Sequence, residues 1–412
     1  MRAFRLSFYI AGAVLALPCR ALAAPPTPTA VGPTLQQAVE GAWLRAPAAR
    51  TLEARQDEVS AARDNARSWL AANPTLGLSQ RADQGGSERR QHESELSLSS
   101  SLWLPGQKRA REQFAARSGE EVAAQLRATR LAVAGMVRNR LWEAAAARVR
   151  LEEKQDHLHH LEGIADEVQR RVRAGDLARS DGLLAQQEVM AARIDVAEAR
   201  TAAREALARY QAVTGAADLP ALEPEPLPEP LTGRALPDNA RLLAAHASER
   251  RAQASLRLAE ASRAAPPTIA LSMRREDERT LREPANSIGL ALQIPLGSAA
   301  RNRGAEAQAR TTIATAAAEA AESQAQAEAE LAVARERLVN ARAALDDANA
   351  RAAALHEHTA LLDKAFRLGE RGLADLLRSR ALTHEADVAV AQQKTALGLA
   401  HALLNQALGI LP

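Results

Sequence analysis

The longest helical pattern in the chain runs from Gln107 to Arg173, and it limits what the chain can fold into. This run contains no Pro and only three Gly, and strong helix formers such as Ala, Arg, Glu, Gln and Leu dominate it. At about 1.5 Å per residue, a helix of this length reaches roughly 100 Å, more than the diameter of a globular domain. The pattern therefore predicts a coiled coil or a tube of helices rather than one compact core.

A second run of the same character extends from Ala299 to Leu368. A surface helix on an ordinary bundle would explain its amphipathicity but not its length. In its second half, mostly Leu and Ala recur at alternating spacings of three and four, which is the spacing of knobs-into-holes packing. These seam positions are Leu331, Ala334, Leu338, Ala341, Leu345, Ala348, Ala352, Leu355, Thr359, Leu362 and Phe366.

The N-terminus has the pattern of a secretory signal peptide over residues 1–23. Arg2 and Arg5 form its basic start, Leu6 to Leu17 is apolar, and Ala21 to Ala23 reads as an A-x-A cleavage site. We therefore expect the mature protein to leave the cytosol. No later apolar stretch approaches the 18 or more residues typical of a membrane-spanning helix, so any membrane insertion would have to use strands.

The single cysteine, Cys19, lies inside this signal. Lipid attachment there would need a small residue just before it, and Pro18 occupies that place, so we favour cleavage after Ala23. A mature chain without thiols would exclude thiol catalysis and Cys-ligated metals. The 53 basic and 50 acidic residues are interleaved along the helical runs, as on solvated helix faces, and export argues against a nucleic-acid partner.

Comparison of the chain with itself reveals a two-fold repeat. Pro74 to Ser79 returns as Pro267 to Ser272, and the spacing from Gly175 to Asp181 returns from Gly369 to Asp375. These matches all sit at offsets near 190 residues. We therefore divide the mature chain into a first repeat, a Pro-rich extended linker and a second repeat, which cover residues 24–215, 216–237 and 238–412.

Each repeat reads helix, strand, strand, long helix, turn and helix. The predicted elements of the first repeat are a helix over 35–72 that is interrupted at Pro47, strands over 75–82 and 94–104, the long helix, and a helix ending at Thr214. Those of the second repeat are a helix over 238–264, strands over 268–275 and 286–294, the long helix, a turn over 369–372 and a helix ending at Leu408.

The predicted strands have one apolar and one small polar face. On the second strand the apolar side chains are Leu96, Leu98, Leu102 and Leu104, and on the fourth they are Ile288, Leu290, Leu292 and Ile294. This alternation is typical of a transmembrane β-strand, although a soluble hairpin with one face on a protein core also fits it. Four strands cannot close a barrel, so a barrel would have to be shared between chains, with three copies giving twelve strands and two giving eight.

In this order and spacing, the elements and motifs resemble the TolC-like outer-membrane efflux proteins. The resemblance covers nearly the whole mature chain. Besides the doubled unit and its turns, it rests on Leu104 to Arg109 after the second strand, and on Ile294 to Leu296 followed by Arg301 to Gly304 after the fourth. It is strongest for the heavy-metal, CzcC-like branch, although Ser298 to Asn302 differs from the Phe-Asp-Arg-Asn segment usual there.

The resemblance implies a mainly α fold with a small β part, assembled as a homotrimer. Long coiled-coil helices would form a periplasmic barrel, and four strands per protomer would contribute to a twelve-stranded β-barrel in the outer membrane. The implied function is the exit channel of a tripartite efflux system. It would passively conduct heavy-metal cations or small toxic compounds from an inner-membrane pump of the resistance-nodulation-division class and its periplasmic adaptor, without enzymatic activity or a cofactor.

The resemblance also indicates where a periplasmic constriction would lie. Asp375 matches a position that forms an acidic ring, Arg371 matches a basic residue beside it, and Asp181 is the counterpart in the first repeat. Arg378 and Phe366 stand where such proteins often have a second Asp and an aromatic hydroxyl. Three copies of Asp375 at a narrow pore would attract cations. Ordinary exposed charges at a helix turn are the alternative.

The histidines are the remaining candidates for chemistry. Two groups fall within single helical turns, but neither spacing supplies a complete set of metal ligands, so we expect solvated side chains and no metal site. No catalytic or nucleotide-binding motif is present. The grouped histidines are His157, His159 and His160, and then His356 and His358.

The alternative function to the exit channel is a soluble periplasmic coiled-coil adaptor or scaffold.

Overall fold

The computed structural model describes residues 33–82, 91–228, 238–278, 284–297 and 299–412. The expected signal peptide, with Cys19, lies outside the described residues, as do Ser298, part of the linker and most of both strand-to-strand connections. The first half contains α1 (Leu35–Arg45), α2 (Pro47–Arg67), β1 (Thr75–Ala82), β2 (Gln91–Ser101), α3 (Gln107–Ala174) and α4 (Arg179–Thr214). The second contains α5 (Ala240–Ala261), β3 (Thr268–Glu278), β4 (Ala285–Gln293), α6 (Ala299–Arg367) and α7 (Leu373–Ala407).

The order helix, strand, strand, long helix, helix therefore occurs twice, and the mainly α fold with four strands is confirmed. The two long helices, α3 and α6, have 68 and 69 residues and begin where the sequence predicts. Glycines end both of them sharply. Gly175 adopts a positive φ of 88° after α3, and Gly369 adopts one of 77° after α6, a conformation that favours Gly because it has no Cβ.

Several predicted boundaries are wrong. The helix predicted over 238–264 ends at Ala261, and the strand predicted over 268–275 continues to Glu278. The helix over 35–72 ends at Arg67, because Ser68 has an extended backbone and its carbonyl accepts a hydrogen bond from Trp103 Nε1 at 3.1 Å. The second strand covers Gln91–Ser101 rather than 94–104, because Ser101 already pairs with Thr268, the first residue of β3. Helix propensity and alternation alone do not locate these tertiary contacts.

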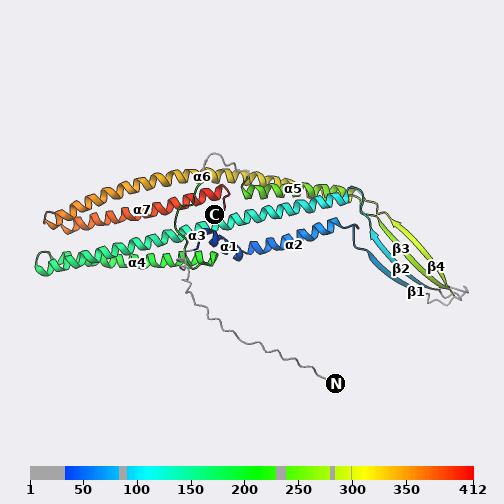
Figure 1. Cartoon of the computed structure of the whole chain (residues 1–412), viewed down its shortest axis with the longest axis horizontal. Helices are drawn as coiled ribbons and strands as arrows, with labels where there is room; N and C mark the ends of the chain where they lie inside the picture. The colour runs from blue at the N-terminus through cyan, green and yellow to red at the C-terminus, as the bar shows by residue number, and fades with distance from the viewer. Residues whose placement is uncertain (1–32, 83–90, 229–237, 279–283, 298) are drawn as a thin grey trace, which may run out of the picture. The chain divides into compact units, whose positions relative to one another are not determined.

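The long helices fold back as two hairpins, one formed by α3 and α4 and the other by α6 and α7 (Figure 1). All eleven predicted seam positions of α6 are buried or half-buried, so the predicted seam lies on the packed face of the helix. Leu331 and Leu338 pack against Leu404 of α7 in one core, while Val137 of α3 and Tyr210 of α4 lie in another. Half of the buried residues in each of these two cores are Ala, which allows the helices to approach one another closely.

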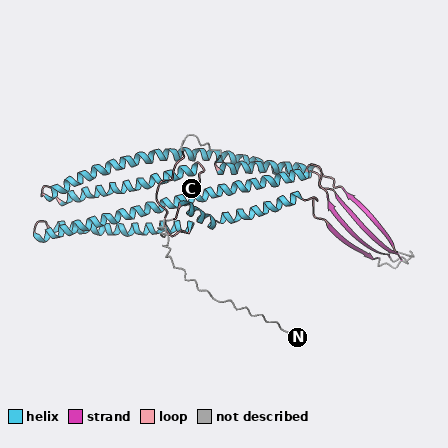
Figure 2. Cartoon of the chain, in the orientation of Figure 1, coloured by secondary structure: helices cyan, strands magenta, loops and turns pink. Residues whose placement is uncertain are grey.

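The four strands form one antiparallel sheet in the order β1-β2-β3-β4 (Figure 2). Its register aligns Leu76 with Leu98, Leu98 with Leu271 and Leu271 with Leu290. Because side chains alternate along a strand, this register gathers the apolar residues of all four strands on one face. No helix in the described parts of the chain combines the length and the hydropathy needed to cross a membrane.

Candidate functional site

The sheet carries an apolar face that no part of the described chain covers. Eight aligned side chains of this face are 48% to 81% exposed, although each is Leu, Ile or Met. Removing these side chains from water would lower the free energy, so this face is suited to contact with lipid or with an apolar partner. The two aligned rows are Leu76, Leu98, Leu271 and Leu290, and then Leu78, Leu96, Met273 and Ile288.

The opposite face of the sheet is small and polar. Gly77, Ser97, Ser272 and Gly289 form its central row. A Cβ on Gly77 would lie 2.6 Å from Ser97 Oγ, and one on Gly289 would lie 2.9 Å from Ser272 Oγ. A side chain at either glycine would therefore displace the neighbouring serine hydroxyl. The contrast between the faces matches the prediction of a strand with lipid on one side and water on the other.

A buried cluster joins the ends of the two hairpins. Phe366 of α6, only 6% exposed, packs with Val168 of α3, Ala185 of α4, and Leu373 and Leu376 of α7. The guanidinium of Arg171 lies 4.9 Å from the centre of the Phe366 ring, within range of a cation–π interaction. Phe366 is thus part of the packing that sets the positions of the hairpin ends, and its ring does not face solvent.

The charged residues of the predicted constriction are placed differently. Asp375, Arg371 and Arg378 are exposed at the start of α7 and in the turn before it. Among the described residues, the ion pairs of this region join Asp363 to Arg367 and Arg380 and do not include these three residues. Asp181 instead accepts a hydrogen bond from the backbone N–H of Ala178 at 3.3 Å and caps α4.

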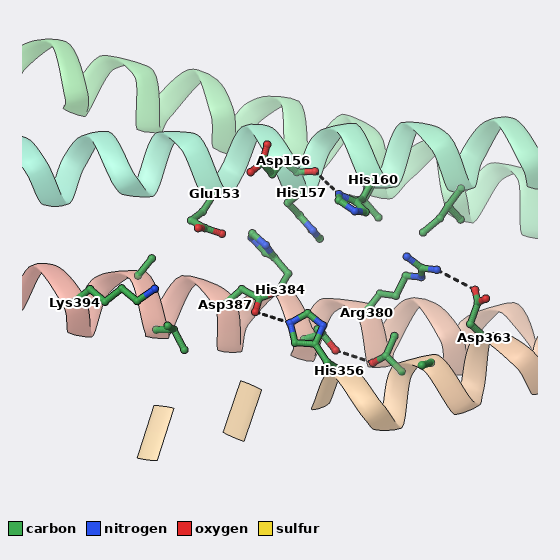
Figure 3. A pocket seen from close by; sticks show the side chains of 17 residues that line it. Glu153, Asp156, His157, His160, His356, Asp363, Arg380, His384, Asp387 and Lys394 are labelled. Atoms are coloured by element: carbon green, nitrogen blue, oxygen red, sulfur yellow. Dashed lines mark hydrogen bonds and ion pairs between the residues drawn. The ribbon is translucent and has the colours of Figure 1, made fainter. Parts of the chain in front are cut away.

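A groove lies between the two hairpins, a little away from their ends. It encloses a cavity of about 670 Å³ lined by α3, α6 and α7. His157 of α3 and His384 of α7 point toward one another across it (Figure 3), with ring centroids 3.9 Å apart and ring planes at 10°. The prediction of solvated histidines holds for the exposed His159 but is wrong for His157, which is half-buried in this stack.

Burial changes the acid–base behaviour of these imidazoles. It lowers the pKa of His157 to about 4, and the neighbouring His384 and Lys154 act in the same direction. Burial, and to a smaller extent the charge of Lys154, also lowers the pKa of His384. Desolvation disfavours the charged form of an imidazole, so both rings are neutral at neutral pH. In the described ranges, no group of three or more His, Cys, Asp or Glu side chains is arranged to hold a metal ion.

Sequence reasoning missed several residues of this groove. His384 and Asp387 were not singled out, because each is an isolated polar residue on α7 and only the packing of α7 against α3 and α6 brings them into the groove. The same holds for a buried hydroxyl cluster, in which Thr359 Oγ1 lies 2.7 Å from both Ser379 Oγ and Thr383 Oγ1. The position of Thr359 in the predicted seam was the only signal in the sequence.

Comparisons with known proteins identify the fold. No family model matches the chain, and no curated protein matches it. Among solved structures, CusC superposes with a TM-score of 0.75 at 16% identity, covering 92% of this chain and 93% of CusC. The outer-membrane protein VceC from Vibrio cholerae gives 0.73 at 16%, covering 91% and 96%. The Neisseria gonorrhoeae outer-membrane channel MtrE, solved in its open state, gives 0.74 at 19%, covering 92% and 89%.

The chain therefore has the fold of outer-membrane channels built from long helical hairpins and a four-stranded sheet. More particularly, it is the fold of the TolC-like channels, and it extends over nearly the full length of both chains in each comparison. The structure of CusC was described in connection with folding and transmembrane channel formation.

Proposed function

We propose that this protein is the outer-membrane exit channel of a tripartite efflux system. The observation that carries the proposal is the sheet, with exposed Leu, Ile and Met on one face and Gly and Ser on the other. Lipid outside and water inside would satisfy both faces at once. Transport through such a channel is passive, so an inner-membrane pump supplies the energy and a periplasmic adaptor connects the two.

The sheet edges support assembly from several copies. In the described chain, β1 and β4 each have a strand partner on one side only. An open edge is not tolerated in lipid because its backbone groups lack hydrogen-bond partners. Since β1 and β4 run antiparallel, β4 of one copy could pair with β1 of the next and continue the alternation. Three copies would close a homotrimeric barrel of twelve strands.

The alternative is a soluble periplasmic adaptor or scaffold. Helical hairpins alone would suit that function equally well. The exposed apolar face of the sheet argues against it, because a soluble protein rarely leaves such a large contiguous apolar patch in water. The second hairpin and the fold comparisons also favour the channel.

The experiment compares two glutamate substitutions on the same strand, in protein expressed in a bacterium with an outer membrane. Leu290→Glu places a charge on the apolar face, where the native side chain is 73% exposed, and Ser287→Glu places one on the polar face. Arg or Lys facing lipid at the bilayer midplane costs about 2–4 kcal/mol, and Glu costs less but is still unfavourable, so Leu290→Glu should reduce outer-membrane recovery after a salt wash. Ser287→Glu should be recovered like the parent.

Recovery of the parent protein in the salt wash, or equal recovery of both variants with the membrane, would contradict the channel proposal.

For the substrate, we propose heavy-metal cations, with small toxic compounds as the second class. A deletion strain should then lose resistance to zinc, cobalt, cadmium or copper. Unchanged metal resistance together with sensitivity to a panel of drugs would assign the second class.

A further inference from the structure

We propose that the stacked imidazoles of His157 and His384 form a proton-sensitive contact that holds α7 against α3 at neutral pH and releases it on acidification. The two rings belong to different hairpins, so the contact bridges the first and second halves of the chain. Nothing in this inference requires the channel function, because it concerns only the spacing of two helices.

The geometry favours the stack only while at most one of the two rings is protonated to imidazolium. With ring centroids 3.9 Å apart and nearly parallel planes, two imidazolium ions would face each other at close range. Their repulsion would be greater than at the surface, since the groove is partly shielded from water. His384 Nε2 is buried without a hydrogen-bond partner, so no neighbour in the described chain stabilises an added proton on that nitrogen.

The carboxylates around the stack favour protonation, Asp195 for both rings and Asp387 for His384, but burial opposes it more strongly. Three carboxylates that face it are already engaged with cations or with another histidine. Glu153 and Asp156 of α3 are the remaining carboxylates, and Lys394 of α7 and His160 of α3 also line the groove. The engaged pairs are Lys154 with Asp195 of α4 at 2.6 Å, His356 with Asp387 at 2.8 Å, and Arg380 with Asp363 at 2.9 Å.

Burial and the neighbouring acids Asp387 and Asp156 raise the pKa of Glu153, so this carboxyl loses its charge earlier than usual as the pH falls. The lowered pKa values of the two imidazoles determine how packing depends on pH. When a His has a lower pKa in the packed state than in the separated state, protonation favours separation. The packing of the two helices is therefore most stable above the ordinary His pKa, near 6.5, and becomes less stable as the pH falls toward the pKa of the packed state. Packing of α7 on α3 should therefore weaken between about pH 6.5 and pH 4.

The test measures the distance between the helices directly. Asp166→Cys on α3 and Ala381→Cys on α7 place spin labels at exposed positions, and Cys19 is the only native cysteine. Pulsed electron paramagnetic resonance on the full mature chain in detergent at pH 7.5 and pH 5 should show a longer distance at pH 5. A change of roughly 5 Å, the scale of a one-turn helix displacement, is expected.

Two double variants keep the test decisive. His157→Phe with His384→Phe preserves an aromatic stack that cannot be protonated, and His157→Gln with His384→Gln gives a polar pair that does not ionise. Both should abolish the pH-dependent change, whereas His159→Phe, at an exposed site on the same helix, should retain it. An unchanged distance in the parent, or a parent-like change in both double variants, would overturn this inference. Absence of bilayer conductance would overturn only the proposed function.

Discussion

Arg138 and Glu225 form a bidentate, hydrogen-bonded ion pair in the interior of the helical region. Arg138 Nε donates to Glu225 Oε1 at 2.8 Å, and Nη2 donates to Oε2 at 2.6 Å, with the Arg138 side chain 1% exposed. Arg138 Nη1 also donates to Gln406 Oε1 at 2.7 Å and to the carbonyl of Ile410 at 3.0 Å. Glu225 belongs to the predicted linker, and Arg138 bonds both to it and to residues at the C-terminal end of the chain. The linker therefore takes part in the packing of the helical region and is not only an extended spacer.

Substituting Glu225 should destabilise the protein strongly. Glu225→Ala would leave the Arg138 charge buried with only neutral acceptors, and removal of one partner of a buried pair costs about 3–5 kcal/mol. Urea-induced unfolding of the purified protein measures this loss. Glu223→Ala, two residues away at an exposed position, should change stability by less than about 0.5 kcal/mol. Equal effects of the two substitutions would show that the pair contributes little.

Two glycines within long helices should respond in opposite directions to alanine. A Cβ on Gly398 of α7 would lie 1.9 Å from the Trp142 ring, which is 5% exposed and has no room to move away. Gly398→Ala should destabilise by about 1–3 kcal/mol through overpacking. A Cβ on Gly163 of α3 meets nothing within 4 Å, so Gly163→Ala should stabilise by up to about 1 kcal/mol. Thermal unfolding distinguishes the signs, and stabilisation by both would refute the close contact with Trp142.

Packing around Phe366 should control the stability of the hairpin ends. Phe366→Ala removes a side chain shared by all four helices there, and such a truncation costs about 3–5 kcal/mol. Amide hydrogen exchange should then speed up around residues 165–185 and 360–380. Leu368→Ala is the matched control, since Leu368 is 67% exposed and its loss should leave exchange unchanged. Faster exchange in both variants, or in neither, would contradict this role of Phe366.

The acidic position of the expected constriction can be tested by its charge. If three copies of Asp375 face a narrow pore, Asp375→Ala should lower cation over anion selectivity in planar bilayers. Asp375→Glu, which keeps the charge, should preserve the selectivity. Removal of the positive charge by Arg371→Ala should shift it in the opposite direction. If all three variants keep the parent's conductance and selectivity, these residues are ordinary exposed charges.

Much of the fold could be predicted from the sequence because it depends on short-range patterns. Helix propensity and the absence of Pro locate α3, and Gly175 locates its end. The internal repeat that begins at Pro74 locates β1, whose bounds Thr75 and Ala82 match the prediction.

What the sequence could not indicate depends on contacts between distant segments. Glu225 was one charge in a Pro-rich stretch, and its partner Arg138 lies 87 residues away. The stack of His157 with His384 likewise requires the two hairpins to pack at one particular register. Of the predicted site residues, Phe366 lies in a core and Asp181 caps a helix. Asp375 is exposed, and whether it faces a pore depends on how several copies of the chain assemble.

The most direct test of the account is the number of copies in the conducting species. The mature protein, extracted from the outer membrane in detergent, should have the mass of three chains by native mass spectrometry. The same preparation should form channels in planar bilayers, because one sheet of four strands leaves two open edges. A single-chain species that conducts ions without assembling would contradict the account.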